Sequence, residues 1–280
     1  MYCKSIYCIV VITYFFSVVK YFFKVNSHNK LSKALAGFGR SLNRYYENRN
    51  HRTESNGEVT VLKKLNQFNP GVIIDGGANV GNYLKLINKH CPKARVYSFE
   101  PVPDTFNKLK YGASANQNNV LVNKGLFKDN CTFAINVFPS DEHASIFDIS
   151  AVSQNPVSTV DIDLVKGDDF ADQEKIDEIF FLKLDLEGAE FDALEGFERM
   201  LKKGAIKVIQ FEYGYINIIT KKLLIDYYKF FEKYGYKVGK IFPKIVEFRQ
   251  YNYKYEDFIG PNFIAVKSDE TAIIEKLANK

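Results

Sequence analysis

The sequence contains no tryptophan, two methionines and four cysteines among 280 residues. Cys3, Cys8, Cys91 and Cys131 are too few for the disulfide framework of a small secreted domain, and they lack the paired spacing of a zinc site. A reducing compartment is therefore the default expectation for the main body of the chain. We identify no metal site, no internal repeat and no low-complexity segment.

Excess positive charge is absent from most of the chain. Residues 1–70 hold eleven Lys and Arg against three Asp and Glu, whereas residues 71–280 hold 27 basic and 30 acidic residues. Nucleic-acid binding by the body is therefore disfavoured, because such proteins need a concentrated basic face. The basic N-terminal arm is more typical of a segment that lies near anionic lipid.

Charge is also missing from residues 5–19, and the apolar stretch continues to Phe23 apart from Lys20. About 20 apolar residues span a bilayer, so residues 1–25 are a candidate membrane anchor with membrane association through residues 5–23. Lys20 and Lys24 follow where a cleaved signal would need small residues. Basic residues after the segment would keep the body on the cytoplasmic side. A helix packed on the domain or in an oligomer interface is the alternative.

Two further regions follow the apolar segment. Residues 26–57 are polar and basic, and we interpret them as a connector with a short amphipathic helix at 33–47. Residues 58–280 are the expected enzyme domain, in which short apolar runs alternate with segments of helical spacing from residue 71 onward. We expect strands at 71–75, 94–100, 119–123, 131–138, 157–165, 178–188, 205–214, 236–242 and 263–267, and helices at 79–90, 104–111, 191–201 and 223–234. This alternation predicts an α/β fold, with a mostly parallel sheet and helices on both faces.

Ligands of such folds bind beyond the carboxyl ends of the strands. The expected ends carry Asp75, Glu100, Asn123, the segment Asp185–Glu187, and Glu212. Four of these five ends are acidic, and a sheet with a purely structural role has no need of that arrangement. The acids therefore indicate a ligand site at this edge.

A glycine-rich turn follows the first strand, with glycines at 76, 77 and 81. It is neither a P-loop nor G-x-G-x-x-G. Glycine lets a ligand approach the backbone, and the next helix offers free N–H groups to an anion. Asp75 would repel a pyrophosphate but attract an ammonium or sulfonium. S-adenosylmethionine carries both cations, a carboxylate and a ribose diol, and Glu100 is placed to accept hydrogen bonds from such a diol.

Three segments, VIIDGGANVGNY, VYSFEPVPDTFNKL and FLKLDLEGAEFDALEGF, resemble the FkbM-type S-adenosylmethionine-dependent methyltransferases. The resemblance covers about residues 71–266, and KLDLEGAE (183–190) is its most specific part. It implies the Rossmann-like methyltransferase sheet with an antiparallel last strand at 263–267, and it places Asn123 on the adenine side. The cofactor-binding residues we predict are Asp75, Gly76, Gly77, Asn79, Gly81, Glu100 and Asn123.

Alternation along FFLKLDLEG places Lys183, Asp185 and Glu187 on one face of the strand. Two neighbouring carboxylates raise the pKa of one of them, which suits a base that removes a hydroxyl proton. Asp185 and Glu187 are therefore our first catalytic candidates, and Glu212 is the second. A divalent metal is the alternative role for the pair, but no third ligand is evident. Glu190 opens the next helix, where we expect a structural role.

The sequence thus predicts a methyltransferase that uses S-adenosylmethionine. The resemblance implies O-methylation of a hydroxyl on a sugar, glycan or secondary metabolite. One alternative is an NAD-dependent oxidoreductase on a related fold, although the glycine pattern for a pyrophosphate is missing and Asp75 opposes it. The other alternative is a non-catalytic binding module tethered to a membrane.

Overall fold

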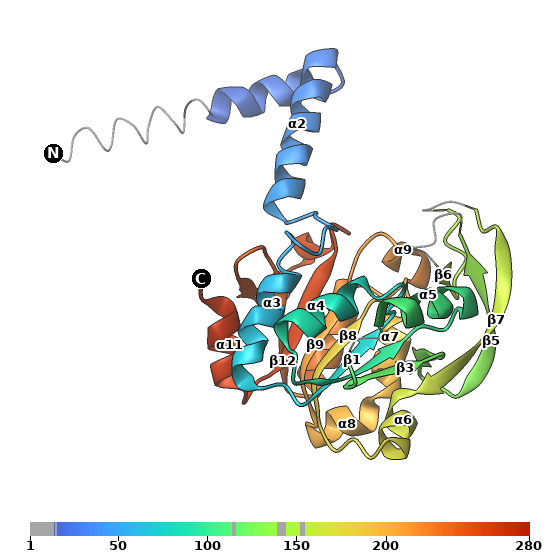
Figure 1. Ribbon diagram of the computed structural model, residues 1–280. Helices are drawn as coiled ribbons and strands as arrows, with labels where there is room; N and C mark the ends of the chain where they lie inside the picture. Colours follow the sequence, from blue (N-terminus) through green and yellow to red (C-terminus); the bar gives the residue numbers. More distant parts are fainter. Residues whose placement is uncertain (1–13, 15, 114–115, 139–143, 152–154) are drawn as a thin grey trace. The chain divides into compact units, whose positions relative to one another are not determined.

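The computed structural model describes residues 14, 16–113, 116–138, 144–151 and 155–280 (Figure 1). The chain divides into two compact units, Met1–Glu47 and Asn48–Lys280. The second unit begins at Asn48 rather than at the expected residue 58. The reason is that the buried Asn48 side chain donates to the carbonyl oxygens of Asn56 (2.7 Å) and Ile241 (2.9 Å), which fixes residues 48–57 to the body.

The N-terminal unit is mostly helical where the structure describes it. Residues 16–25 form a helix, and α2 (Lys30–Tyr46) covers the region in which an amphipathic helix was expected. Asn29 caps α2, since its side chain accepts from the Ser32 N–H (2.8 Å). Among the described residues, no helix combines the length and the apolar character needed to cross a bilayer. Most of the apolar segment at 5–23 lies outside those residues, so the anchor stays a prediction.

The main sheet has eight strands in the order β11-β10-β12-β9-β8-β1-β2-β3. Five neighbours, from β9 through β3, are parallel to one another, whereas β12 runs antiparallel to both β9 and β10, and β11 runs antiparallel to β10. The strand bounds are β1 Val72–Gly76, β2 Arg95–Phe99, β3 Asn119–Val122, β8 Ile179–Leu184, β9 Ile206–Glu212, β10 Tyr236–Ile241, β11 Val246–Phe248 and β12 Asn262–Lys267. The antiparallel last strand and the predicted fold class are confirmed.

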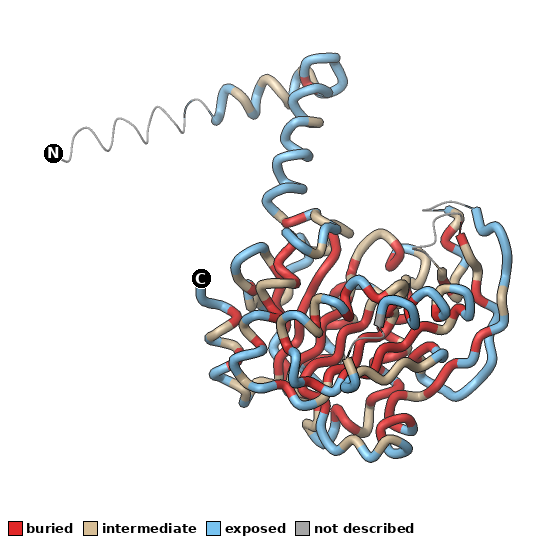
Figure 2. The backbone as a smooth tube through the Cα atoms, in the orientation of Figure 1, coloured by how far each residue is buried: buried red, intermediate tan, exposed pale blue. Residues whose placement is uncertain are grey.

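Helices cover both faces of this sheet and bury the strands between them (Figure 2). One face packs against α3 (Glu58–Leu65), α4 (Asn82–His90), α5 (Pro103–Ala113) and α11 (Thr271–Ala278). The other face packs against α6 (Gly167–Gln173), α7 (Glu190–Gly196), α8 (Glu198–Lys203) and α10 (Leu224–Lys233). The short elements η1 (Asn66–Phe68), α9 (Asn217–Thr220) and η2 (Tyr253–Tyr255) lie in connections. The helix expected at 191–201 is interrupted at the buried Phe197, which separates α7 from α8.

A second sheet stands beside the main one, in the order β4-β7-β5-β6. Its strands are β4 (Gly125–Phe127), β5 (Cys131–Val137), β6 (Ala144–Ser145) and β7 (Ser158–Lys166). The sequence predicted β5 and β7 as strands but did not separate them from the main sheet. Ile135, Ile162 and Leu164 pack with Val102 to form a small apolar core, so this sheet offers an apolar wall near the carboxyl ends of β1 and β2.

Candidate active site

A row of polar side chains crosses the middle of the main sheet. Gln210 on β9, Lys183 on β8, Asp75 on β1 and Ser98 on β2 are neighbours in register, and all four are buried. Side chains in register on adjacent parallel strands point to the same face of a sheet. The row therefore concentrates polar and charged side chains on the face of the sheet that α3 and α4 cover.

Lys183 is the centre of this row. Its Nζ lies 3.7 Å from Asp75 Oδ1 and 3.1 Å from Asp185 Oδ2, and 4.8 Å from the centre of the Tyr83 ring. Burial alone would lower the pKa of Lys183, but Asp185, Asp75 and Glu58 raise it above its usual value. Lys183 thus stays charged and links the strand end of β1 to that of β8.

Asp75 is fully buried, and neither of its carboxylate oxygens has a hydrogen-bond partner among the described residues. Burial raises the pKa of Asp75 to about 6, although the charge of Lys183 acts in the opposite direction. A buried carboxylate with one ion pair and no hydrogen bond is costly, and such exceptions occur at functional sites. Asp75 therefore depends on Lys183 for its charge balance.

Glu58, the first residue of α3, extends the polar cluster toward the N-terminal segment of the body. Its two oxygens accept from Gln210 Nε2 (2.6 Å) and from Asn56 Nδ2 (2.7 Å). Burial raises the pKa of Glu58. Through these bonds the residues that precede α3 are held over the carboxyl ends of the central strands.

The turn after β1 brings two strand ends into close contact. Gly77 has φ +77°, and a Cβ there would lie 1.8 Å from the carbonyl oxygen of Asp185, so only glycine fits. The N–H groups of Gly77 and Ala78 both donate to the Phe99 carbonyl, and that of Asn79 donates to Glu100 Oε2 (3.0 Å). These three amides are therefore occupied, because the turn uses them to fix itself to β2. The expectation of free N–H groups concerned the helix that follows, which begins at Asn82, and it stays a prediction.

Glu100 follows β2 and is buried. Besides the Asn79 N–H, its carboxylate accepts from the Val102 N–H (3.0 Å), and burial raises its pKa to about 7 against the effect of these bonds. Asn123 donates to the carbonyl oxygens of Glu100 (2.9 Å) and Pro101 (3.0 Å). Asn123 thus holds the backbone that positions Glu100.

The chain leaves β8 at Leu184, four residues earlier than the expected strand end. Glu187 (φ +50°) and Gly188 (φ +109°) turn the backbone, so strand alternation accounts for the contact of Lys183 with Asp185 but not for the position of Glu187. Glu190 accepts from the N–H groups of Leu186 (2.7 Å) and Gly188 (3.1 Å). Its expected structural role is confirmed, and burial raises its pKa to about 7.

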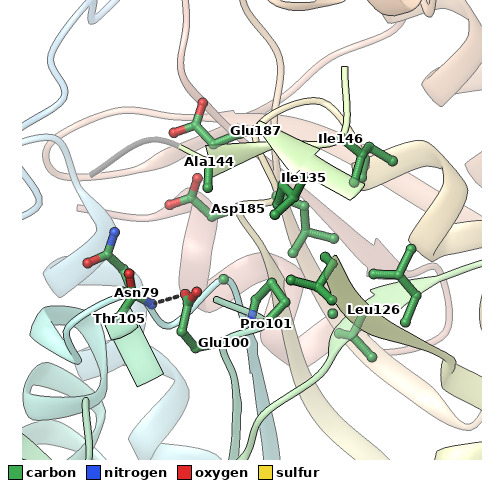
Figure 3. A pocket seen from close by; sticks show the side chains of 16 residues that line it. Asn79, Glu100, Pro101, Thr105, Leu126, Ile135, Ala144, Ile146, Asp185 and Glu187 are labelled. Atoms are coloured by element: carbon green, nitrogen blue, oxygen red, sulfur yellow. Dashed lines mark hydrogen bonds between the residues drawn. The ribbon is translucent and has the colours of Figure 1, made fainter. Parts of the chain in front are cut away.

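Three cavities meet at these strand ends. The first, the apolar cavity, encloses about 740 Å³ including solvent at its mouth. Asn79, Glu100, Asp185 and Glu187 line one side of it, as Figure 3 shows. The opposite wall is apolar and comes from the second sheet and its neighbours: Pro101, Leu126, Ile135, Ile146, Ile162 and Leu164.

The other two cavities share Asp185 with the apolar cavity, but no residue of its apolar wall lines them. The inner cavity, of about 610 Å³, is lined by polar groups that include Asn56, Tyr83 and Lys183. The outer cavity, of about 950 Å³, is lined by residues that include Tyr215 and Phe258. Asp185 lines all three cavities, and Glu212 lines the inner and the outer one. Asp185 therefore stands at their junction.

Glu212, the last residue of β9, lies among other acids. Burial raises its pKa well above the usual value, and the charges of Asp185, Glu187 and Glu190 act in the same direction. Burial also raises the pKa of Tyr215 in the same cavity. A carboxylate with a raised pKa accepts a proton more readily, which is the property expected of a general base.

The predicted site residues fall into three groups. Gly77, Asn79 and Glu100 line the apolar cavity, and the three catalytic candidates Asp185, Glu187 and Glu212 all line the outer one. Asp75, Gly76, Gly81 and Asn123 line none of the three cavities. Their direct contact with a cofactor stays a prediction.

Sequence reasoning missed several lining residues. His51, Thr53 and Asn56 belong to the segment interpreted as a connector, and Tyr83 was assigned only to the core face of a helix. No sequence signal marks the first three, because their position depends on the anchoring of residue 48. In the part of the chain that the structure describes, no three His, Cys, Asp or Glu side chains are grouped so that they could hold a metal ion.

Comparisons with known proteins found a family model and a relative that match this chain in sequence. The model of a family described as "Methyltransferase FkbM domain" matches residues 75–238. Over 176 residues the chain is 25% identical to the hexuronic acid methyltransferase AglP of Haloferax volcanii, an alignment that covers 61% of this chain and 69% of the relative.

Solved structures show more distant similarity. The precorrin-6y C5,15-methyltransferase of Geobacter metallireducens GS-15 has 15% identity and a TM-score of 0.38, with 74% of this chain and 83% of that chain covered. Fibrillarin of Aeropyrum pernix, solved with natively bound S-adenosyl-L-methionine, has 10% identity and a TM-score of 0.40, with 71% and 66% covered.

Proposed function

Because this chain belongs to the FkbM methyltransferase family, we propose that it transfers the methyl group of S-adenosylmethionine to an oxygen atom of a sugar. S-adenosylmethionine is the methyl donor of this family. The observation that carries the proposal is the position of Asp185, which lines the apolar, the inner and the outer cavity at once. A side chain at that junction can contact both a bound cofactor and its acceptor.

The apolar and inner cavities fit the two ends of S-adenosylmethionine. The apolar wall at Leu126 and Ile162 suits an adenine ring, and the Glu100 carboxylate beside it suits ribose hydroxyls. The inner cavity offers polar groups for an amino-acid end. Among them is the Tyr83 hydroxyl, which is buried and has no hydrogen-bond partner among the described residues. An orphaned buried hydroxyl in a polar cavity is the kind of group that a ligand satisfies.

The bound cofactor supplies a methyl group on a sulfonium, which is a good leaving group. The protein must then align the acceptor and remove its proton, and alignment is the larger contribution. Glu212 and Asp185 are placed for the second task, since both line the inner and the outer cavity. The raised pKa of Glu212 favours its use as the base.

The outer cavity supports a sugar as the acceptor. Tyr215 and Phe258 provide aromatic faces, and the carboxylates of Glu187 and Glu212 can accept hydrogen bonds from hydroxyl groups. The relative AglP is a hexuronic acid methyltransferase by name, which points to the same class of acceptor. The chemistry of the lining favours a hydroxyl oxygen as the methylated atom.

A transfer assay with labelled S-adenosylmethionine and a panel of glycans, uronic acids included, tests this function. We expect label on a sugar oxygen and a rate about 100-fold lower or more for Asp185→Asn. Asp192→Asn is the matched control, because Asp192 pairs with Lys128 (2.7 Å) and lines none of the three cavities. Treatment with mild base separates a methyl ester, which is cleaved, from a methyl ether, which persists.

Three results would contradict the proposal. Label found on nitrogen or carbon would exclude O-methylation. Binding of S-adenosylmethionine in a titration without transfer to any sugar would favour the non-catalytic module. A titration with NAD that matched the one with S-adenosylmethionine would favour the oxidoreductase.

We also propose that residues 5–23 hold this enzyme on the cytoplasmic side of a membrane. The support is their apolar sequence and the basic residues after them, such as Lys20 and Lys24. Membrane fractionation of the full chain and of a shorter chain that begins at Asn26 tests this. After a carbonate wash, which removes peripheral proteins, we expect only the full chain in the membrane fraction. Release of the full chain by the wash would contradict it.

A further inference from the structure

Helix α2 carries charge of one sign only. Its 17 residues include Lys30, Lys33, Arg40 and Arg44 and no acidic residue. At about 100° per residue, three of these cations, at 33, 40 and 44, project from one side of the helix and Lys30 lies at the edge of that side. The helix therefore has a cationic face.

The opposite side of α2 is apolar and exposed. Leu31, Leu35, Phe38 and Leu42 follow one another at spacings of four, three and four residues, which places them in a single stripe. Their exposed fractions are 58%, 44%, 64% and 53%, and the helix is pale along most of its length in Figure 2. Exposed apolar stripes of this kind mark interaction surfaces.

The charges of α2 decide which partner fits the stripe. Two copies of α2 would each bring four cations and no acid, whereas paired helices rely on opposite charges beside the apolar seam. The body offers no net attraction either, since residues 48–280 hold 31 basic and 32 acidic residues. An anionic lipid surface satisfies both faces, because it takes up the apolar stripe and attracts the cations.

We propose that α2 lies in the plane of an anionic membrane surface, with the stripe Leu31–Leu35–Phe38–Leu42 in the acyl region and the cations toward the headgroups. The helix of residues 16–25 also exposes apolar side chains, such as Phe16 and Tyr21. The proposal concerns an interfacial helix. It depends neither on a membrane-spanning segment nor on the methyltransferase activity.

The test uses a fluorescent label whose emission reports its surroundings, attached to the full chain at Leu42→Cys or, as the matched control, at Asn43→Cys. These neighbours lie about 100° apart around the helix. The background replaces the native cysteines other than the buried Cys91 with serine. The probe is vesicles of phosphatidylcholine and phosphatidylglycerol in equal parts, compared with phosphatidylcholine alone.

We expect the label at 42 to shift to the blue with anionic vesicles, with little change at 43 and little with neutral vesicles. Arg40→Gln and Arg44→Gln should each weaken binding about five-fold at low salt. A label at 42 that is already shielded without vesicles would overturn the proposal, because another protein surface would then cover the stripe. Equal responses at 42 and 43, or equal shifts of the label at 42 with anionic and with neutral vesicles, would overturn it as well.

Discussion

Replacement of Lys183 by methionine removes the cation that serves two carboxylates. Lys183 Nζ lies 3.7 Å from Asp75, and at an effective dielectric constant of ~20 this pair attracts by about 4 kcal/mol. Loss of one partner from a buried ion pair costs about 3–5 kcal/mol, because the other charge stays buried. We therefore expect Lys183→Met to lower the free energy of unfolding by about 4 kcal/mol at pH 8.

The deficit should depend on pH. The pKa of Asp75 is about 6 in the folded protein, above its ordinary value of 3.8, so folding favours the protonated acid and stability is lost as pH rises through this interval. Without Lys183 the folded pKa rises further and the loss extends to higher pH. Urea unfolding should show that Lys183→Met loses less free energy of unfolding at pH 5 than at pH 8. At pH 5 less free energy is needed to protonate Asp75, and a neutral Asp75 no longer needs the lysine.

Two further variants complete this test. Asp75→Asn in the Lys183→Met background should recover part of the lost stability, since it removes the unpaired charge. Lys207→Met is the matched control: Lys207 is partly exposed and pairs with Glu178 and Glu270, so its loss should cost less than about 1 kcal/mol. Any of three results would refute the reasoning: an equal loss of stability for the two lysine variants, a loss in Lys183→Met that does not depend on pH, or no gain of stability when Asp75→Asn is added to Lys183→Met.

Three other outcomes follow from the site. Gly77→Ala should cost more than about 3 kcal/mol and abolish cofactor binding, whereas Gly235→Ala, at the nearly equal φ of +76° but with open space around its Cβ, should cost about 1–2 kcal/mol in urea unfolding. Glu100→Ala leaves two backbone N–H groups without their acceptor and should raise the calorimetric Kd for S-adenosylmethionine about ten-fold or more. The rate of methyl transfer should rise with pH through a pKa well above the usual 4.5 of a glutamate, since the base must be deprotonated. Glu212→Gln should abolish this rise of the rate with pH, even though Asp185 is still present.

The sequence predicted the architecture and the edge of the sheet that holds the site. Strand periodicity located Asp75, Glu100 and Glu212 within a residue of the ends of β1, β2 and β9, and that is enough to bring them to one edge of a parallel sheet. The resemblance added the antiparallel last strand. These features depend on local patterns that a single sequence contains.

The residues that contact these acids could not be predicted from the sequence. The register that sets Lys183 beside Asp75 depends on how β8 pairs with β1, and these residues are more than one hundred positions apart in the chain. The amides of the glycine-rich turn bind the Phe99 carbonyl and Glu100, because β2 lies next to β1, and the sequence showed no sign of these partners. Long-range pairing, which local periodicity does not encode, accounts for both differences.

Two walls of the site were also unpredicted for a physical reason. The apolar wall at Leu126 and Ile162 comes from a second sheet whose strands look like any other half-buried strands in sequence. The polar wall at Asn56 depends on hydrogen bonds that fix residues 48–57 to the body through Asn48 and Glu58. A polar segment of this composition resembles a connector until its partners are known.

The structure of the complex with S-adenosylhomocysteine tests the central claim most directly, since that claim is the placement of a methyl donor along cavities that join at Asp185. The account predicts the adenine ring against Leu126, the ribose beside Glu100 and the amino-acid end beside Tyr83. A ligand bound with its sulfur remote from Asp185, or with its adenine outside the apolar cavity, would contradict it.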